Sequence, residues 1–428
     1  MRVYRRVAPP GALLSEREIT ETTAEALSQA ELGGARVLVV IPDGTRTAPV
    51  ALFFRLLSGL LRYRVGRLDF LVALGTHQPM SAVALLGHVG VSREELETRF
   101  KGIGVLNHEW YAPGVLRTVG VIPAGEVREL SRGLLAEDVE VSINRRIFDY
   151  DHLILCGPVF PHEVAGFSGG NKYLFPGISG GRIVDVTHWL GALITCSEII
   201  GTKHTPVRAM IDRARALIKV PVVGICCVVT GEGLCGLYIG PAEDAWSEAA
   251  DLSSRVHIAY VPRAYPKVIS VMPPMYKDLW TGAKGMYKLE PVVADGGELV
   301  IFAPHITEIS YTHGTVIDRI GYHVRDYFLA QWERFRQEPW GVLAHSTHVR
   351  GAGTFIDGKE EARIRVTLAT GIPAERCSRV NLGYRDPASV DLELRQSREA
   401  EGVLVVPKAG EILYRLKGQR HHDVLGDG

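Results

Sequence analysis

The sequence predicts an α/β protein of two α/β domains with mostly parallel sheets and an active-site cleft between them. The chain has 428 residues, which is more than one hydrophobic core commonly supports. Short β-branched runs alternate with longer helical patterns, as is typical of βαβ units around a parallel sheet. Because this pattern restarts after about residue 260, we expect an N-terminal domain over residues 1–262 and a C-terminal domain over residues 263–428.

Three predicted strands of the N-terminal domain each lead into a polar segment that contains glycine. These strands are expected at residues 36–41, 68–74 and 152–156. The segments that follow them carry Asp43 and Arg46, then His77, then His162. Open α/β sheets bind their ligands at the carboxyl ends of the strands. The convergence of three such segments therefore predicts a ligand site at this edge.

The C-terminal part of the chain has a similar alternation of strands and helices. Strands are expected at residues 267–272, 298–302, 341–344, 363–368 and 403–406. Helices are expected over residues 182–190 and 324–335. The tail at residues 420–423 contains two histidines, and we expect it to be a solvated end rather than a metal site.

Composition excludes several classes of function. Lys+Arg and Asp+Glu are both 48, so the formal net charge is zero, and neither a nucleic acid nor a membrane surface is expected as the main partner. No run of about 20 apolar residues is long enough to span a bilayer. The six cysteines have no zinc-like spacing and lie mostly in apolar runs, which indicates buried, reduced thiols. We expect a cytoplasmic protein without a signal peptide.

Residues 161–172 form the most informative motif, with the sequence Pro-His-Glu-Val-Ala-Gly-Phe-Ser-Gly-Gly-Asn-Lys. A glycine pair lets backbone N–H groups approach an anion closely, so the motif is typical of a phosphate or carboxylate loop. It is no Walker A loop, because Asn171 separates Gly170 from Lys172, and no nucleophile elbow surrounds Ser168. A tight structural turn is the alternative interpretation.

Several residues around this motif have the chemistry of an active site. His162, Lys172 and His188 offer a proton-transfer group, an amine and a metal ligand. Asp43 could cap the following helix and bond a ribose hydroxyl, while Arg46 offers a bidentate fork to a carboxylate or phosphate. In isolation, each has an ordinary structural explanation as a helix, loop or cap residue.

Taken together, the motifs resemble those of the lactate racemase family. Their order is Asp-x-x-Arg, Gly-Thr-His, His-x-x-Ala-Gly-Phe-Ser-Gly-Gly-x-Lys, and a histidine sixteen residues beyond that lysine. The resemblance covers most of the first 190 residues, extends more loosely to Lys284, and is weak in the last third. The segment at 161–172 is specific, whereas Asp-x-x-Arg alone is not.

The resemblance implies a nickel-pincer nucleotide, which is a pyridinium mononucleotide with two sulfur arms. Lys172 would carry it covalently, and His188 would be the protein ligand to nickel, beside two sulfurs and a ring carbon. The residues that would contact the nucleotide or its phosphate are Asp43, Thr45, Gly166, Ser168, Gly169 and Gly170.

The resemblance also implies a catalytic set and a reaction. His77 and His162 would be the two acid/base residues, Arg46 would hold the substrate carboxylate or position reacting groups, and Lys284 would contact substrate. The reaction would invert carbon 2 of a 2-hydroxy acid by proton-coupled hydride transfer to the pincer, because a simple base cannot remove the weakly acidic α-proton.

The predicted pocket wall departs from that of the lactate-active members. Trp280 and Thr281 stand where those enzymes have Tyr and Gln, and Trp332 and Trp340 are both candidates for the family's active-site tryptophan. This pattern predicts a related acid rather than lactate itself, such as a larger or sugar acid. Cofactor-synthesis proteins would be maturation partners, and no oligomeric state is predicted.

Two other functions are compatible with the residues. One is a metal-dependent isomerase or lyase of sugar acids that uses the same scaffold without the pincer. The other is a nucleotide- or anion-binding module without chemistry, in which case the clustering of His77, His162, Lys172 and His188 would be accidental.

Overall fold

The computed structural model describes residues 1–231, 233–391 and 399–418, and the tail at residues 420–423 lies outside these. The chain divides into two compact units. The first contains residues 1–160, 167–184 and 208–256, and the second contains residues 161–166, 185–207 and 257–428. Three segments of the expected N-terminal domain, residues 161–166, 185–207 and 257–262, thus group with the second unit. The expected boundary and cleft stay predictions. In the described part of the chain, no helix is long and apolar enough to cross a membrane.

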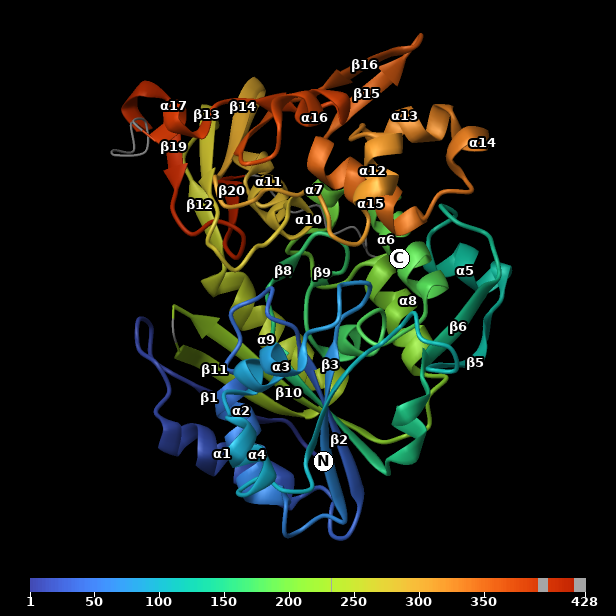
Figure 1. Cartoon of the computed structure of the whole chain (residues 1–428), viewed down its shortest axis with the longest axis vertical. Coiled ribbons are helices and arrows are strands. Elements are labelled where there is room, and N and C mark those ends of the chain that lie inside the picture. The colour runs from blue at the N-terminus through green and yellow to red at the C-terminus, as the bar shows by residue number, and fades with distance from the viewer. Residues whose placement is uncertain (232, 392–398, 419–428) are drawn as a thin grey trace. The chain divides into compact units, whose positions relative to one another are not determined.

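The first unit is organised around a seven-stranded sheet with the order β1-β11-β10-β7-β2-β3-β4 (Figure 1). The five strands from β10 to β4 are parallel, and β11 and β1 add an antiparallel edge. The strands are β1 (Tyr4–Val7), β2 (Arg36–Pro42), β3 (Arg67–Ala73), β4 (Gly104–Asn107), β7 (His152–Pro158), β10 (Val222–Thr230) and β11 (Gly233–Pro241). Six of the seven β2 side chains are buried, as expected of a strand covered on both faces.

Helices bury the faces of this sheet. The apolar sides of α1 (Glu16–Ser28) and α2 (Val50–Leu61) join one core cluster with β2 and β3. A second cluster lies under α9 (Ala242–Val256), beside β10 and β11. Shorter helices and a hairpin complete the chain in this region: α3 (Ala82–Val89), α4 (Arg93–Glu97), α5 (Ala124–Leu130), η1 (Arg145–Asp149), η2 (Gly170–Tyr173), α8 (Pro206–Arg215) and the pair β5 (Leu116–Ile122) and β6 (Val139–Asn144).

The second unit contains a five-stranded sheet, all parallel, with the order β18-β17-β14-β13-β19. Its strands are β13 (Tyr265–Val271), β14 (Val293–Ala303), β17 (Arg365–Thr370), β18 (Gly383–Tyr384) and β19 (Val403–Val406). Smaller pairs join β12 (Ile258–Val261) to β20 (Leu413–Leu416), β15 (Gly353–Ile356) to β16 (Lys359–Ala362), and β8 (Pro161–His162) to β9 (Gly166–Phe167). The prediction of an α/β fold with mostly parallel sheets is confirmed.

Many short helices accompany the second sheet. They are α7 (Cys196–Ile199), α10 (Leu279–Gly282), α11 (Lys284–Tyr287), η3 (Glu290–Val292), α12 (Gly314–Ile320), α13 (Arg325–Ala330), α14 (Trp332–Phe335), α15 (Trp340–Arg350), α16 (Ala374–Arg379), α17 (Pro387–Asp391) and η4 (Glu399–Glu401). The helix α6 (Gly181–Ile194) contains the predicted helix at 182–190.

One predicted strand is wrong. Residues 341–344 belong to α15, in which every residue from Trp340 to Val349 is buried. A helix that is covered on all sides presents a continuous apolar run, and such a run cannot be distinguished from a buried strand by its periodicity. The helix expected over residues 324–335 is interrupted at Gln331, where α13 ends and α14 begins.

A fully buried histidine, His108, directly follows β4 in the first unit. His108 is 0% exposed, its Nε2 contacts the Ser179 carbonyl at 3.1 Å, and its Nδ1 contacts the Asn144 amide at 3.0 Å. Burial lowers the pKa of His108 to about 4. Its ring is therefore neutral in the folded protein near pH 7.

This histidine predicts a loss of stability in acid. The unfolded chain binds a proton at His108 below about pH 6.5, whereas the folded chain does so only near pH 4. Its contribution to stability is therefore complete above pH 6.5 and is lost as the pH falls toward 4. Urea titrations should show that wild type loses about 1.4 kcal/mol more unfolding free energy per pH unit in this window than His108→Gln. The exposed His204→Gln is the control, and equal slopes for wild type and His108→Gln would contradict the prediction.

Candidate active site

Parallel pairing places three chain reversals at one edge of the first sheet. β2 pairs in parallel with β3 on one side and with β7 on the other. The segments that leave their carboxyl ends start at Asp43, at Leu74 and at Val159. A backbone hydrogen bond of 2.8 Å from Gly75 to Gly177 ties the second of these segments to the chain that follows η2. This edge is the expected ligand-binding edge of the sheet.

Asp43 and His77 form a hydrogen-bonded pair at this edge. His77 Nδ1 lies 2.5 Å from Asp43 Oδ2. The other carboxylate oxygen, Oδ1, accepts from the Thr45 hydroxyl at 2.7 Å and from the Thr45 N–H at 3.2 Å. The Asp43 side chain is 12% exposed and that of His77 is 34% exposed. The carboxylate is thus anchored by its own turn and orients a more accessible imidazole.

The expectation that Asp43 caps the next helix is wrong. α2 begins only at Val50, with Pro49 at the cap position and no side-chain cap bond. Asp43 instead closes a short turn onto Thr45 and reaches across to the loop after β3. Pro49 delays the helix, because a proline disfavours helical backbone angles at the residue before it.

Lys172 lies on η2, which packs against β2, β7, β10 and α9. Its neighbour Tyr173 is buried, and its hydroxyl takes the space that a side chain at Gly157 would need. Burial raises the pKa of Tyr173 well above its ordinary value, and the Arg46 guanidinium opposes that rise. Lys172 and Arg46 are both half-buried. The structure thus brings Asp43, Arg46, His77 and η2 to one edge.

The glycine-rich segment is packed tightly against its own unit. Gly169 and Gly170 have φ angles of 82° and 58°, which favour glycine. A Cβ on Gly170 would lie 2.9 Å from Cβ and Cγ of Trp246. The Trp246 indole N–H donates to the Ser168 carbonyl at 2.9 Å, and Arg208 lies over its ring at 3.9 Å. The glycines are therefore required by packing, and their contact with a phosphate stays a prediction.

Buried polar groups form further hydrogen bonds with the glycine-rich segment. Arg208 donates to the carbonyls of Phe167 and Gly169, and burial lowers its pKa to about 10. The Ser168 hydroxyl accepts from the Phe160 N–H at 2.9 Å and donates to the Pro158 carbonyl at 3.3 Å. These two hydrogen bonds hold the turn at the end of β7, so the Ser168 hydroxyl stabilises the backbone there.

In the second unit, His162 is 3% exposed and is held by backbone groups. The N–H groups of Val164 and Ala165 donate to its Nδ1 at 3.1 and 3.4 Å. The Glu163 carboxylate lies 3.4 Å from the same nitrogen. Gly166, which follows, has a φ of 76° and its α-carbon faces the Thr202 carbonyl so closely that no side chain fits there. Sequence analysis did not assign a role to Glu163.

His188 lies on α6 and is half-buried. Its Nδ1 is 3.5 Å from the Thr187 hydroxyl. The next residue, Trp189, stacks on Trp332 with ring centroids 5.2 Å apart, and Trp332 in turn contacts Trp340 at 5.4 Å. The two candidate tryptophans therefore belong to one aromatic group. Contact of either with a substrate stays a prediction.

Lys284 follows a loop at the carboxyl end of β13. It is 9% exposed, and its Nζ lies 5.0 Å from the centroid of the Tyr276 ring. Asp278 caps α10 by accepting from the Thr281 N–H at 3.0 Å and its hydroxyl at 2.8 Å. Thr281, expected at the pocket wall, is thus engaged in a helix cap, beside the half-buried Trp280.

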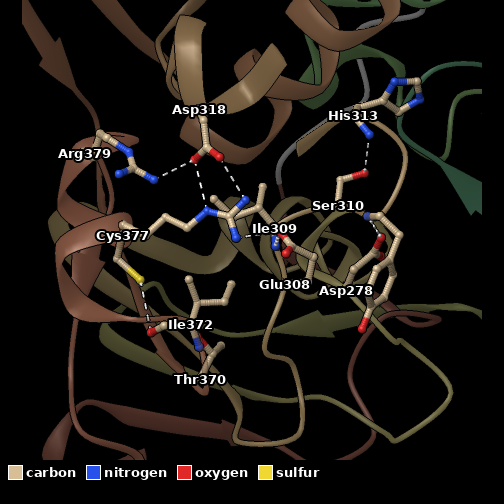
Figure 2. A network of polar contacts seen from close by, with 12 residues as sticks. Asp278, Glu308, Ile309, Ser310, His313, Asp318, Thr370, Ile372, Cys377 and Arg379 are labelled. Carbon is tan, nitrogen blue, oxygen red and sulfur yellow. Dashed lines mark hydrogen bonds and ion pairs between the residues drawn. The ribbon is translucent and has the colours of Figure 1, made fainter. Parts of the chain in front are cut away.

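The loop after the neighbouring strand β14 is clamped by ion pairs, as Figure 2 shows. Arg376 pairs with Glu308 at 2.7 Å and with Asp318 at 2.9 Å. Glu308 also accepts from the Ile309 N–H at 2.7 Å, and the Ser310 hydroxyl accepts from the His313 N–H at 3.0 Å. This clamp fixes the backbone of the loop that carries His313.

Trp280 contacts two imidazole rings that the sequence analysis did not single out. The ring of His345 stacks on it at 3.9 Å with an interplanar angle of 9°, and the ring of His313 lies at 4.5 Å. His345 contacts the Trp280 carbonyl through Nε2 at 3.1 Å, and burial lowers its pKa to about 3. His345 directly follows residues 341–344, which were predicted as a strand, and no motif of the sequence contains it.

The two units thus hold different parts of the predicted set. Asp43, Thr45, Arg46, His77, Ser168, Gly169, Gly170 and Lys172 belong to the first unit, and His162, Gly166, His188 and Lys284 belong to the second. In the described part of the chain, no three His, Cys, Asp or Glu side chains form a group that could hold a metal ion.

This geometry defines a class of α/β protein. Its members have an aspartate–histidine pair and a turn with a lysine at the carboxyl edge of a parallel sheet. The model of the lactate racemase N-terminal domain matches residues 15–198. This match places residues 15–198 in the lactate racemase family.

Individual relatives agree with this placement. The chain is 24% identical over 287 residues to the lactate racemase of Thermoanaerobacterium thermosaccharolyticum, covering 63% of this chain and 60% of that protein. It is 23% identical over 304 residues to the lactate racemase of Lactiplantibacillus plantarum, covering 68% and 66%. Each match thus spans somewhat less than two thirds of the relative's length.

Two solved structures resemble the whole chain. A crystal structure of a protein from Thermotoga maritima is 34% identical, with a TM-score of 0.87 over 95% of this chain and 99% of that one. The lactate racemase apoprotein from Thermoanaerobacterium thermosaccharolyticum is 18% identical, with a TM-score of 0.69 over 94% of both chains. At that identity, the second likeness shows the fold.

The packing of the glycine segment predicts the effect of a single methyl group. Gly170→Ala should lower the unfolding free energy by about 2–4 kcal/mol, because the left-handed backbone and the contact with Trp246 both oppose a Cβ. Urea titration measures the change. Gly44→Ala is the matched control, since no atom lies within 4 Å of its Cβ position. Equal midpoints for the two variants would contradict this account.

Proposed function

We propose that this chain is a racemase or epimerase that inverts carbon 2 of a 2-hydroxy acid with the help of a nickel-pincer nucleotide. The observation that carries the proposal is the Asp43–His77 pair at the sheet edge to which η2 brings Lys172. A base of this kind removes a hydroxyl proton, which is the proton chemistry that such an inversion needs. Membership of the lactate racemase family supports the same reaction class.

The residues fit the cofactor that the family implies. Lys172 offers an amine on a short turn whose neighbours Gly170 and Tyr173 are fixed by packing. The described residues offer no three-donor metal group, so a metal at His188 needs donors from outside the protein. A pincer ring with two sulfurs and a carbon would supply those donors. When bound, the nickel-pincer group supplies the hydride acceptor.

The chain's own residues then orient the substrate and move its hydroxyl proton. Asp43 orients His77, so that Nε2 of the imidazole can accept the proton while Nδ1 stays on the carboxylate. Arg46 and Lys284 are the cations that would hold the substrate carboxylate. His162 would be the second acid/base residue. Asp43 and Thr45 would also contact the nucleotide, through atoms other than those that join the two residues.

The substrate is proposed to be a larger or sugar acid rather than lactate itself. The ring of Trp280 contacts the rings of His313 and His345, four positions before Lys284 in the sequence. Imidazole, indole and hydroxyl groups offer several donors and acceptors, whereas the lactate methyl group needs none. A substrate with further hydroxyl groups would match them.

The first test is the cofactor itself. Protein from cells that co-express the pincer-synthesis proteins should have an intact mass raised by the cofactor, and peptide mapping should place the adduct on Lys172. Lys172→Arg keeps the charge and should stay unmodified. The loaded enzyme is then assayed against a panel of 2-hydroxy acids for inversion at carbon 2. An unmodified mass with activity that survives nickel depletion would reject the pincer and favour a metal-dependent isomerase or lyase.

A second test concerns the metal ligand. His188→Ala should lose nickel while the adduct on Lys172 persists, because the covalent link and the metal bond are separate. Elemental analysis measures nickel, and mass spectrometry measures the adduct in the same sample. The exposed His204→Ala is the control. Stoichiometric nickel in His188→Ala would show that another residue is the ligand.

A further inference from the structure

A cavity of about 110 Å³ lies within the second unit. Its wall is formed by the carboxyl end of α6, by α7 and η3, and by the carboxyl end of α15. Among the side chains that line it are those of Cys196, Glu290, Thr347 and His348. None of the lining residues belongs to the set proposed for the reaction, so the proposed function leaves this cavity unexplained.

His348 is a buried histidine of this wall with an unsatisfied ring nitrogen. The residue is 4% exposed, and no group in the described part of the chain forms a hydrogen bond with its Nε2. Burial lowers the pKa of His348 to about 4, so the ring is neutral near pH 7. A buried polar atom without a partner costs stability unless water or a ligand supplies the missing hydrogen bond. The ring nitrogen is therefore available to a ligand in the cavity.

The charged residues of the wall are each balanced by an oppositely charged neighbour. Glu290 lies 3.7 Å from Arg363, and Arg325 lies 2.9 Å from Asp326. Burial raises the pKa of the Cys196 thiol well above its ordinary value, so the thiol is uncharged near pH 7. A charged ligand would bring a charge without an opposite partner into a largely buried space, which is costly. These groups therefore favour an uncharged ligand.

The polar groups of the wall include both donors and acceptors. The Thr347 hydroxyl donates to the Ala344 carbonyl at 2.8 Å, so its oxygen is still able to accept. Glu290 accepts a backbone N–H at 2.8 Å through Oε1, which leaves Oε2 as a second acceptor. The Thr195 and Ser197 hydroxyls lie 3.1 Å apart, and because one donates to the other, the pair keeps one hydrogen to donate. A ligand with several hydroxyl groups matches this wall, since each hydroxyl both donates and accepts.

Thr195 has a strained backbone conformation in this wall. Its φ is 101° and its ψ is 147°, a region that β-branched residues rarely adopt. The Thr195 N–H donates to the Gly191 carbonyl at 3.0 Å, and the Thr195 carbonyl accepts from the Ile199 N–H at 3.2 Å. Strained residues of this kind cluster at ligand-binding sites. The strain thus supports a ligand site independently of the unsatisfied nitrogen of His348.

We infer that this cavity is a binding site for a small, uncharged polyol. One hydroxyl group of the ligand bonds Nε2 of His348, and a second bonds Oε2 of Glu290. The cavity has the volume of roughly three or four water molecules, at about 30 Å³ each. Glycerol fits such a space, whereas sorbitol, which is about twice as large, does not. This site and the proposed active site share no residue, so each can be tested without the other.

Saturation-transfer NMR on the full-length protein measures the binding directly. Glycerol should give a signal that saturates with concentration, whereas sorbitol at the same molar concentration should give none. Ala192→Leu adds bulk to the α6 side of the wall and should abolish the glycerol signal. A glycerol signal that never saturates, that equals the sorbitol signal or that persists in Ala192→Leu would show that the cavity holds only water, and would overturn the assignment.

His348→Phe tests the role of the ring nitrogen, because phenylalanine keeps a buried ring and lacks the unsatisfied atom. Glycerol binding should weaken about tenfold, as for the loss of one hydrogen bond to the ligand. His204→Phe, at an exposed position, is the matched control and should bind glycerol as wild type does. Unchanged affinity in a folded His348→Phe would refute the role of this ring.

Labelling of Cys196 tests the site without any substitution. Methyl methanethiosulfonate is a small, uncharged thiol reagent, and peptide mass spectrometry measures the labelling of each cysteine. Saturating glycerol should slow the labelling of Cys196 relative to that of Cys377, which is also buried but lies on α16, outside the cavity wall. Equal slowing at both cysteines would show only the general stabilising effect of a polyol and would reject binding in this cavity.

Discussion

The parallel pairing of β2 with β3 and with β7 is the constraint on which the candidate site of the first unit depends. Parallel neighbours end at the same edge, so residues 34 positions apart in sequence, Asp43 and His77, meet at 2.5 Å. The same edge receives η2, whose Tyr173 fits only because Gly157 has no side chain. Backbone register, rather than any single contact, brings the chemistry together.

Dense packing beneath this edge fixes the turn that carries Lys172. Arg208 and Trp246 lie on different helices, and both bond the carbonyls of the glycine segment while stacking on each other. A buried arginine is stable there because the carbonyls and the indole face compensate the loss of water. The glycines therefore serve the protein's own close packing. That rigidity is a useful property for a residue proposed to anchor a cofactor.

Histidines in this chain are kept neutral or oriented by their surroundings rather than by their positions in sequence. His108 and His345 are neutral because burial lowers their pKa values to about 4 and about 3. His77 and His162 are distinguished by an acceptor beside one ring and two donors beside the other. One residue type thus supplies two neutral buried rings and two rings with opposite hydrogen-bond surroundings.

The sequence by itself determined the α/β class, seven of the eight strands that it predicted, and the motifs that indicate the family. Strand periodicity is local, and the motifs at 43–46, 75–77 and 161–172 are contiguous, so both can be read without a structure. The tertiary structure alone decided that residues 341–344 are helical, because a helix buried on all sides loses its polar face. It also decided that Asp43 orients His77 instead of capping α2, that Trp246 accounts for Gly170, and that His345 stacks on Trp280. These are contacts between residues 34 to 76 positions apart, and no local pattern encodes which distant side chain fills a given space.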